Sequence, residues 1–398
     1  MITASLDYIP LLFTQFISHF LNIFTFKQPE NEIIGIPKYT RISGYSCRSL
    51  FDTTIKFYTD KNPNLKILTT PLHHTSFRNI IEKYVKKENI YILEINDKYN
   101  KIVGVPENVE VDLCIITHVF GQDLDCSILR EYKNNSNCIM IEDRVQGGHL
   151  EKIFSYNFMD ISIYSTGMDK KPCGLGGGFL CMNQEMIQNE LYDYLELTIQ
   201  NYPQEHFYDR FIFLIKKIPT YFLYNSKIFI RIILMIFEYF DFDLHLFSSK
   251  YRKINPGFSH DDYNKNPSNG TLKSIEMSLK NYKKIEELYI QKSTHFYKLL
   301  NTNTRETMIP WVNNKYTLTP YNTIIVKDRD KIIKYFNKNR IPIIENPTYK
   351  MFNFVYKDSE KYQKFNDSIV YIPSLPIMND SEIIYLASLI NDYYSYNH

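Results

Sequence analysis

The chain lacks several features that identify particular classes of protein. Its 46 lysines and arginines nearly balance its 44 aspartates and glutamates, so it has no strong positive field of the kind that attracts nucleic acid. We therefore expect no nucleic-acid partner. With 398 residues, of which 44% are apolar, the chain can bury a sizeable core, which excludes a disordered protein and suits one large domain with a smaller one attached.

Clustered cysteines are also absent. The six cysteines form no CxxC pair and have no spacing that is typical of a metal site. We therefore expect reduced thiols, a cytoplasmic location and no bound metal. Because neither overall charge nor cysteine pattern points to a partner, function has to be inferred from individual sites.

The N-terminal segment, residues 1–28, is apolar but is not a simple membrane anchor. It has no basic region at its start and carries Asp7, and polar residues interrupt it, so neither a signal peptide nor a spanning helix fits. Its large apolar residues fall on one helical face: Leu12, Phe13, Phe16, Ile17, Phe20, Leu21 and Phe24. This pattern predicts an amphipathic helix that packs on its own protein or a partner subunit, with peripheral membrane contact as the other interpretation.

A second apolar segment, residues 206–250, is rich in aromatic and basic residues. Lys216, Pro219 and Arg231 are among the residues that break its apolar runs, so it offers no stretch of roughly twenty apolar residues for a spanning helix. We expect a helical insertion that packs as core, lines a dimer contact or rests on a bilayer.

Between residues 29 and 205, short apolar runs alternate with helical patterns. The runs lie at 65–71, 89–95, 111–121, 138–143, 160–165 and 177–182. Such alternation predicts an α/β fold: a large domain with a mostly parallel sheet and helices on both faces. Residues 251–398 predict a long linking helix followed by a small α+β C-terminal domain.

Glycine is scarce, with 13 residues in the whole chain, yet four glycines fall between Gly174 and Gly178. Two lysines, Lys170 and Lys171, come shortly before them. A nucleotide-binding P-loop needs the order GxxxxGK[ST], in which the lysine follows the glycines. Since the order here is reversed, this segment is not a P-loop, and its lysines need another explanation.

Two polar residues end neighbouring strands of the expected sheet. Asp143 ends the run CIMIED and Ser165 ends DISIYS, and ligands of open α/β sheets bind beyond such carboxyl ends. A buried carboxylate needs a cationic partner, a hydroxyl with the backbone N–H groups after it can bind phosphate, and a nearby lysine can bond covalently to an aldehyde. Pyridoxal 5′-phosphate requires these three elements, although a lone aspartate here would more often be a helix cap or a loop residue.

The same residues carry a family resemblance. IEDRVQGG followed by DISIYSTGMDKKPCGLGGGF resembles the "IEDAAQA-G … S-x-x-x-D-K … GG" pattern of the DegT-like sugar aminotransferases, which are fold type I pyridoxal-phosphate enzymes. SGYSCRSLF, VDLCIITHVFGQDLD and SNGTLKSIEMSLKNYKKIEEL are similar to further segments of that family. The resemblance covers most of the chain except the N-terminal helix and residues 206–247.

The resemblance implies a role for each matching residue. Lys170 would be the lysine that bonds to the cofactor, and Asp143 would be the partner of the pyridine nitrogen. Gln146 would contact the ring oxygen, and Ser165 the phosphate. Further cofactor contacts would come from Ser46, Cys47 and Arg48 at the phosphate, from His74 (with His73 as second choice) stacked on the ring, and from Asn269 at the phosphate of the other subunit of a homodimer.

Two departures from the family pattern affect these assignments. The arginine of the family's "NYR" motif is Thr271 here, which leaves any contact made by that arginine unassigned. Lys171 directly follows Lys170, and we prefer Lys170 because it stands at the family's spacing, five residues after Ser165. Relatives that replace this lysine by histidine are dehydratases, so a retained lysine favours transamination.

The sequence therefore predicts a pyridoxal-phosphate-dependent aminotransferase. The resemblance implies transfer of an amino group from a donor such as glutamate to a nucleotide-linked keto sugar, as in polysaccharide biosynthesis. The alternative is a weak or inactive scaffold with the same fold, in which the N-terminal helix and residues 206–247 mediate assembly or membrane contact.

Overall fold

The computed structural model describes most of the chain. The described residues are 13–21, 24, 39–107, 109–119, 123–146, 154–167, 170, 172–183, 190–225, 232, 235–236, 263–307, 322–339, 341, 344–345, 349–351, 359–372 and 378–396. Most of the predicted 206–250 insertion beyond residue 225, as well as Lys171, lies outside these ranges.

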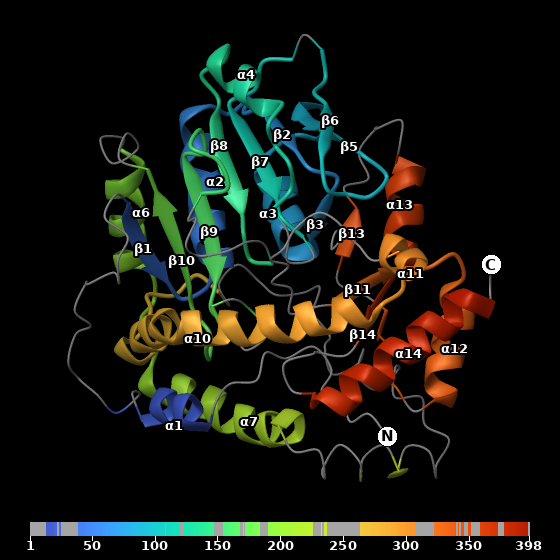
Figure 1. Cartoon of the computed structure of the whole chain (residues 1–398). Coiled ribbons are helices and arrows are strands. Elements are labelled where there is room, and N and C mark those ends of the chain that lie inside the picture. The colour runs from blue at the N-terminus through green and yellow to red at the C-terminus, as the bar shows by residue number, and fades with distance from the viewer. Residues whose placement is uncertain are drawn as a thin grey trace.

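A seven-stranded sheet forms the centre of the large domain (Figure 1). Its strands are, in sheet order, β1 (Thr40–Gly44), β10 (Gly178–Met182), β9 (Ile161–Ser165), β8 (Ile139–Asp143), β7 (Leu113–Thr117), β2 (Ile67–Thr69) and β4 (Ile90–Ile92). β7 and β10 are buried at every position, as expected of strands with a helix layer on each side. The predicted mostly parallel sheet is therefore confirmed.

One strand runs against the others. β4, β2, β7, β8 and β9 pair in parallel, whereas β10 pairs antiparallel with both β9 and β1. The loop between β9 and β10 therefore leaves and re-enters the sheet at the same edge. This loop contains Lys170 and the glycines Gly174 to Gly178, so the sheet fixes both of its ends.

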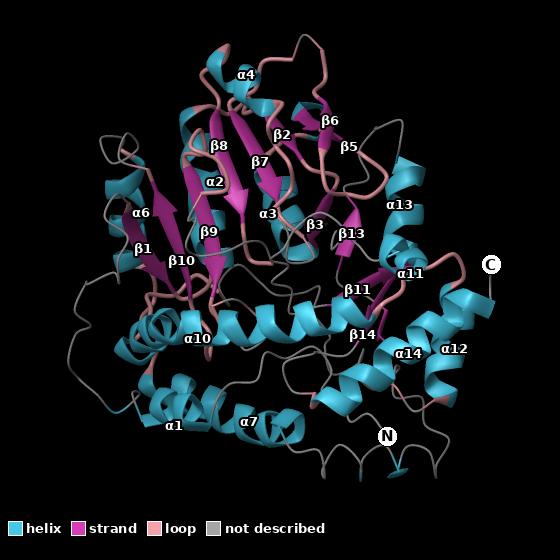
Figure 2. Ribbon diagram, viewed as in Figure 1, coloured by secondary structure: helices cyan, strands magenta, loops and turns pink. Residues whose placement is uncertain are grey.

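Helices cover both faces of the sheet (Figure 2). On one face pack α2 (Cys47–Lys61), α3 (Thr75–Tyr84) and α6 (Leu191–Asn201), and on the other α4 (Leu129–Asn134), α10 (Asn269–Leu299) and α13 (Ser359–Ser368). Alternate residues of each strand feed the two layers: Ile141 packs with α2, whereas Met140 packs on the opposite side.

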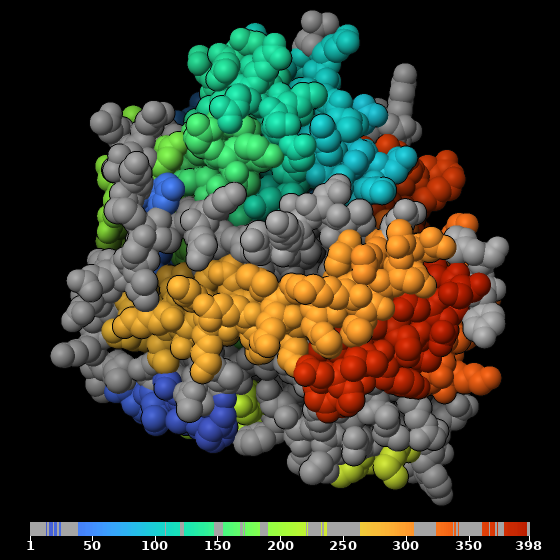
Figure 3. Space-filling model, viewed as in Figure 1, coloured from blue at the N-terminus to red at the C-terminus, as the bar shows by residue number. Residues whose placement is uncertain are grey.

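The C-terminal part has its own small sheet, in the order β11 (Asn322–Ile325), β14 (Ile369–Ile372), β12 (Ile344–Glu345). Its core also includes α12 (Arg329–Lys338) and α14 (Asp380–Tyr396), and α14 packs along α10 (Figure 3). A two-stranded pair joins it to the large domain: β13 (Tyr349–Met351) lies antiparallel to β3 (Leu72–His74). α11 (Thr302–Thr307) and the hairpin of β5 (Glu94–Ile95) with β6 (Ile102–Gly104) complete the described elements, together with a short 3-10 turn at Lys87–Asn89.

The two segments outside the family pattern pack against each other. The N-terminal segment forms α1 (Phe13–Leu21), and the start of the insertion forms α7 (Phe207–Asn225). Phe16 stacks on Tyr221 with ring centroids 4.2 Å apart, which confirms that the N-terminal helix packs on its own protein. Figure 1 shows both helices beneath α10. None of the described helices combines the length and apolar character needed to cross a bilayer.

One predicted strand is wrong in detail. The run at 89–95 forms two strands in different sheets, because β4 joins the central sheet and β5 turns away to pair with β6. Apolar residues are equally suited to either sheet, so the composition of the run could not reveal that the strand breaks at Leu93. Leu93 lies between β4 and β5 in the chain and is fully buried.

We expect the substitution Gly178→Ala to destabilise the fold. An added Cβ would overlap the backbone nitrogen of Cys47 and lie 2.9 Å from its Cα, and these atoms cannot move without shifting the start of α2. We predict a loss of about 2–4 kcal/mol in the free energy of unfolding, measured by urea denaturation. In the control Gly104→Ala the added Cβ meets the exposed side chain of Glu94, which can rotate away, so equal losses in both variants would contradict the explanation.

Candidate functional site

The predicted strand-end residues lie at one edge of the sheet. β8 ends at Asp143 and the neighbouring β9 ends at Ser165. Asp143 is only 3% exposed, and its Oδ1 accepts a hydrogen bond from the Val145 backbone N–H at 3.0 Å. Burial raises the pKa of Asp143 to about 6, although Val145, His118 and Lys170 favour the charged form. The site thus holds a carboxylate whose charge is only partly compensated.

The N-terminus of α2 lies beside this carboxylate. Ser46 is the N-cap, and its Oγ accepts a hydrogen bond from the Ser49 backbone N–H at 3.1 Å. Ser46 also forms a bridge with Gly177, so the glycine loop touches the helix start. Backbone N–H groups at a helix N-terminus attract anions, above all phosphate. The predicted phosphate segment therefore has the local structure that this role requires.

Cys47 shows which side chains the fold brings together. Burial raises the pKa of its thiol to about 11, and the charges of Arg48, Asp143 and Lys170 and a hydrogen bond from Ser165 also act on it. Arg48, Asp143, Ser165 and Lys170, all named from the sequence, thus lie in the electrostatic surroundings of Cys47 at this edge.

Lys170 lies on the loop between β9 and β10, half-buried, with its backbone N–H donating to the Gly167 carbonyl at 3.1 Å. Its ammonium favours the charged forms of both Asp143 and the Cys47 thiol. The amine and the buried carboxylate thus influence each other electrostatically at this edge of the sheet.

The two adjacent histidines have different environments. His73 is completely buried, with Nε2 2.7 Å from Thr69 Oγ1 and Nδ1 2.6 Å from Thr117 Oγ1. Thr117 pairs with Asp143 across β7 and β8. Burial, together with His74, lowers the pKa of His73 to about 3, so its ring is neutral. His74, the residue preferred from the sequence, instead caps α3 and accepts from the Ser76 backbone N–H at 3.2 Å.

A charged network that the sequence did not predict lies behind the site. Glu142 accepts from Ser162 Oγ at 2.6 Å and lies 2.9 Å from His118 Nε2 and 3.2 Å from Arg144 Nη1. Arg144 also pairs with Asp123 at 2.9 Å. Burial alone would raise the pKa of Glu142, but Arg144 and His118 outweigh it and lower the value to about 2. The network pairs the Glu142 carboxylate with the Arg144 guanidinium and ties the end of β8 to the start of β9.

Three further residues were named from the sequence. Gln146 is buried three positions after Asp143. Asn269 is the first residue of α10. The resemblance predicts that it contacts the cofactor phosphate of a second subunit, so a single chain is not expected to bring it to Lys170. Thr271, which replaces the family's arginine, donates its hydroxyl to Glu205 Oε2 at 2.6 Å.

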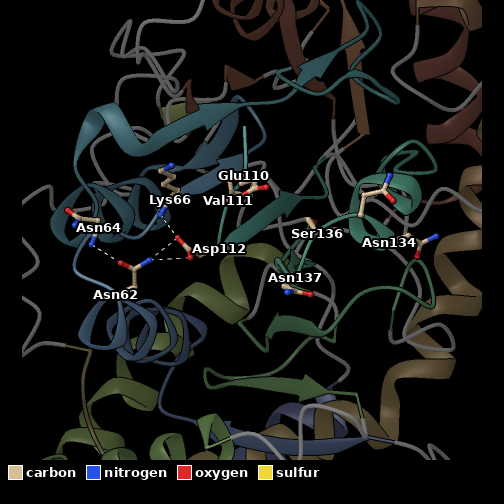
Figure 4. A pocket seen from close by; sticks show the side chains of 10 residues that line it. Asn62, Asn64, Lys66, Glu110, Val111, Asp112, Asn134, Ser136 and Asn137 are labelled. Carbon is tan, nitrogen blue, oxygen red and sulfur yellow. Dashed lines mark hydrogen bonds between the residues drawn. The ribbon is translucent and has the colours of Figure 1, made fainter. Parts of the chain in front are cut away.

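A hollow of about 590 Å³ lies at the opposite edge of the sheet (Figure 4). Asn62, Lys66 and Asp112, which precede β2 and β7, contribute to its wall. The Asp112 carboxylate accepts from Asn62 Nδ2 at 3.2 Å and from the Lys66 backbone N–H at 2.8 Å, so these groups satisfy one another. Because ligands of such sheets bind at the carboxyl ends of the strands, we do not assign the chemistry to this hollow.

Solved structures with the same fold include several sugar-modifying enzymes. The aminotransferase PseC of Helicobacter pylori, described as involved in the biosynthesis of pseudoaminic acid, is 12% identical with a TM-score of 0.63, covering 99% of this chain and 100% of that one. The putative sugar aminotransferase Spr1654 of Streptococcus pneumoniae, in its PMP form, is 10% identical with a TM-score of 0.65, covering 98% and 99%. The GDP-4-keto-6-deoxymannose-3-dehydratase ColD is 12% identical with a TM-score of 0.58, covering 88% of each chain.

These likenesses confirm the fold. The chain has the fold type I architecture that the DegT-type sugar aminotransferases share, as the sequence motifs predicted. No protein-family model matches the chain, and comparison with curated proteins also finds no match. Since both aminotransferases and a dehydratase have this fold, activity has to be argued from the site.

We expect Asp143→Asn to stabilise the cofactor-free protein at pH 7. The pKa of Asp143 is about 6 in the folded protein and about 4 in an unfolded chain. Between these two values the carboxyl group is protonated in the folded protein but ionised in the unfolded one, so raising the pH favours unfolding. The wild type should therefore lose stability relative to the variant as the pH rises from about 4 to about 6, reaching a difference of about 1–3 kcal/mol above it. Urea unfolding of both proteins at four pH values measures this difference, and a pH-independent difference would contradict the assignment.

Proposed function

We propose that this chain is a pyridoxal-phosphate-dependent aminotransferase. The observation that carries the proposal is the grouping of Lys170, the buried Asp143 carboxylate, Ser165 and the N-terminus of α2 at one sheet edge. A fold alone would not require these four features to coincide. The sugar aminotransferases that share the fold support the same reaction class.

The residues present fit this cofactor. Asp143 is buried without full charge compensation, which a protonated ring nitrogen would supply. The α2 N-terminus and the Ser165 hydroxyl suit the phosphate, and we propose that Gln146 donates to the ring oxygen. When bound, pyridoxal phosphate would supply an aldehyde that captures amines and a ring that accepts electrons. Lys170 would hold the cofactor and would move a proton at the substrate carbon.

We propose His74, the residue preferred from the sequence, as the ring-facing side chain. His74 is partly exposed, and its hydrogen bond from the Ser76 backbone N–H occupies only Nδ1, which leaves the face of the ring available for stacking. His73 is completely buried between Thr69 and Thr117, so it supports this wall of the site from behind.

The substrates follow from the resemblance. We propose glutamate as amino donor and a nucleotide-linked keto sugar as acceptor, in a homodimer that brings Asn269 of each subunit to the phosphate of the other. The retained Lys170 supports transamination over dehydration. All six cysteines are free and buried, which supports the proposal of a reducing, cytoplasmic location.

The scaffold alternative keeps one supporting observation. α1 exposes Phe13, Ile17 and Leu21, with Phe13 59% and Leu21 57% exposed. We propose that this face gives the enzyme a peripheral contact with a membrane surface, which would suit an acceptor delivered there. Contact and catalysis are compatible, so the exposed face does not argue against an enzyme.

The central test is the fate of Lys170. Purified protein should show a visible absorption band with pyridoxal phosphate, and borohydride should convert the adduct to a stable linkage on Lys170. The variant Lys170→Ala should lose the band and at least a thousandfold in transamination rate, because no other group both holds the cofactor and moves the proton. Mass spectrometry of the reduced protein identifies the modified lysine, and modification of Lys171 or an intact band in the variant would sink the assignment.

Membrane contact has a separate test. Replacing Phe13 and Leu21 by serine should lower the fraction of protein that floats with anionic phospholipid vesicles at least fivefold, because the apolar area that would enter the bilayer is lost. Leu197→Ser on α6 is the control, since Leu197 is 62% exposed but lies on another element. Equal flotation of all three proteins would remove this part of the proposal.

A further inference from the structure

Arg210 on α7 carries a buried guanidinium group, and two of the three nitrogens of this group have no hydrogen-bond acceptor among the described residues. The residue is 4% exposed, and the two nitrogens are Nε and Nη2. The guanidinium lies over the Phe213 ring, with its central carbon 5.3 Å from the ring centroid. Because burying an unpaired charge is costly, a cation in this state calls for an anionic partner.

The loop that follows Lys170 reaches this guanidinium. Gly176 has a φ of +101°, and a Cβ added there would lie 3.2 Å from Arg210 Nη1. The next residue, Gly177, forms the bridge with Ser46, the N-cap of α2. Arg210 therefore lies beside the glycine loop, at the edge of the candidate site where the backbone N–H groups of α2 begin.

The nearby acidic residue does not satisfy Arg210. Glu205 acts electrostatically on Arg210, but its Oε2 accepts from the Ser268 backbone N–H at 2.9 Å, from Ser268 Oγ at 2.7 Å and from Thr271 Oγ1 at 2.6 Å. Three donors on one oxygen tie Glu205 to the start of α10. The charges that act on the adjacent Tyr45 include both Arg48 and Arg210, so two arginines gather here.

We propose that Arg210 binds a small oxyanion, a phosphate or carboxylate group of a small-molecule ligand, at the junction of α7, the glycine loop and the start of α2. The unpaired Nε and Nη2 form the side of the guanidinium fork that grips such a group with two parallel hydrogen bonds. The inference rests on the proposed function for the origin of the anion, which is either the cofactor phosphate or an anionic group of a substrate. α7 begins the segment that the sequence resemblance leaves out, so the resemblance does not supply this contact.

The test measures anion binding without catalysis. Cofactor-free full-length protein is titrated calorimetrically with inorganic phosphate and, separately, with glutamate. Arg210→Met should weaken binding of at least one probe tenfold or more. The affinity of Arg210→Lys, which keeps the charge but loses the two parallel N–H donors, should lie between those of Arg210→Met and the wild type. Repeating the phosphate titration on protein loaded with pyridoxal phosphate identifies the natural anion. If inorganic phosphate no longer binds, the cofactor phosphate occupies the Arg210 site; if it still binds, the site is free for an anionic group of a substrate.

A matched arginine distinguishes ligand binding from a structural role. Arg144 is equally buried but is paired with Asp123 and Glu142, so Arg144→Met should lower the unfolding temperature sharply. Arg210→Met should leave the unfolding temperature unchanged or raise it. Unchanged affinity for both probes in Arg210→Met, or a destabilisation as large as that of Arg144→Met, would overturn the inference. Because no step uses Lys170 chemistry, failure here is distinct from failure of the proposed function.

Discussion

The burial of the Asp143 carboxylate is the constraint on which the rest of the site depends. An apolar strand carries this acid into a fully covered sheet edge, where its charge is unfavourable unless a cation is present. Lys170 and His118 supply part of that compensation. Part of the negative charge of Asp143 therefore stays uncompensated in the folded protein. This uncompensated charge favours binding of a positively charged ring at this edge.

Maintaining this uncompensated charge requires rigid surroundings. Directly beside Asp143, Glu142 is held by His118, Arg144 and Ser162, which restrains the end of β8. Likewise, Gly178 allows the backbone of Cys47 to approach so closely that the start of α2 has little freedom. A poorly compensated charge beside well-paired ones is typical of binding sites. Such a site is unfavourable in the empty protein, and the well-packed structure around it keeps the fold stable.

Much of this site could be predicted from the sequence, because apolar runs show where strands end and polar residues at those ends share an edge. Asp143 and Ser165 were selected in this way, and Lys170 by the spacing of the family motif. The resemblance preferred His74 over His73, but the complete burial of His73 could not be predicted, because it depends on the packing of β3, whose partner strand lies in the distant C-terminal part. Arg210 gave no signal, because an arginine within an amphipathic helix is usually exposed at its tip.

The short ladder between β3 and β13 gives the small domain a mechanical connection to the site. His73 lies opposite Lys350, and His74 opposite Tyr349, so the backbone that carries the buried histidine is hydrogen-bonded to the C-terminal part of the chain. A displacement of β13 would therefore be transmitted to β3 through the hydrogen bonds of this ladder. The position of the C-terminal part and the position of the two histidines are thus mechanically coupled.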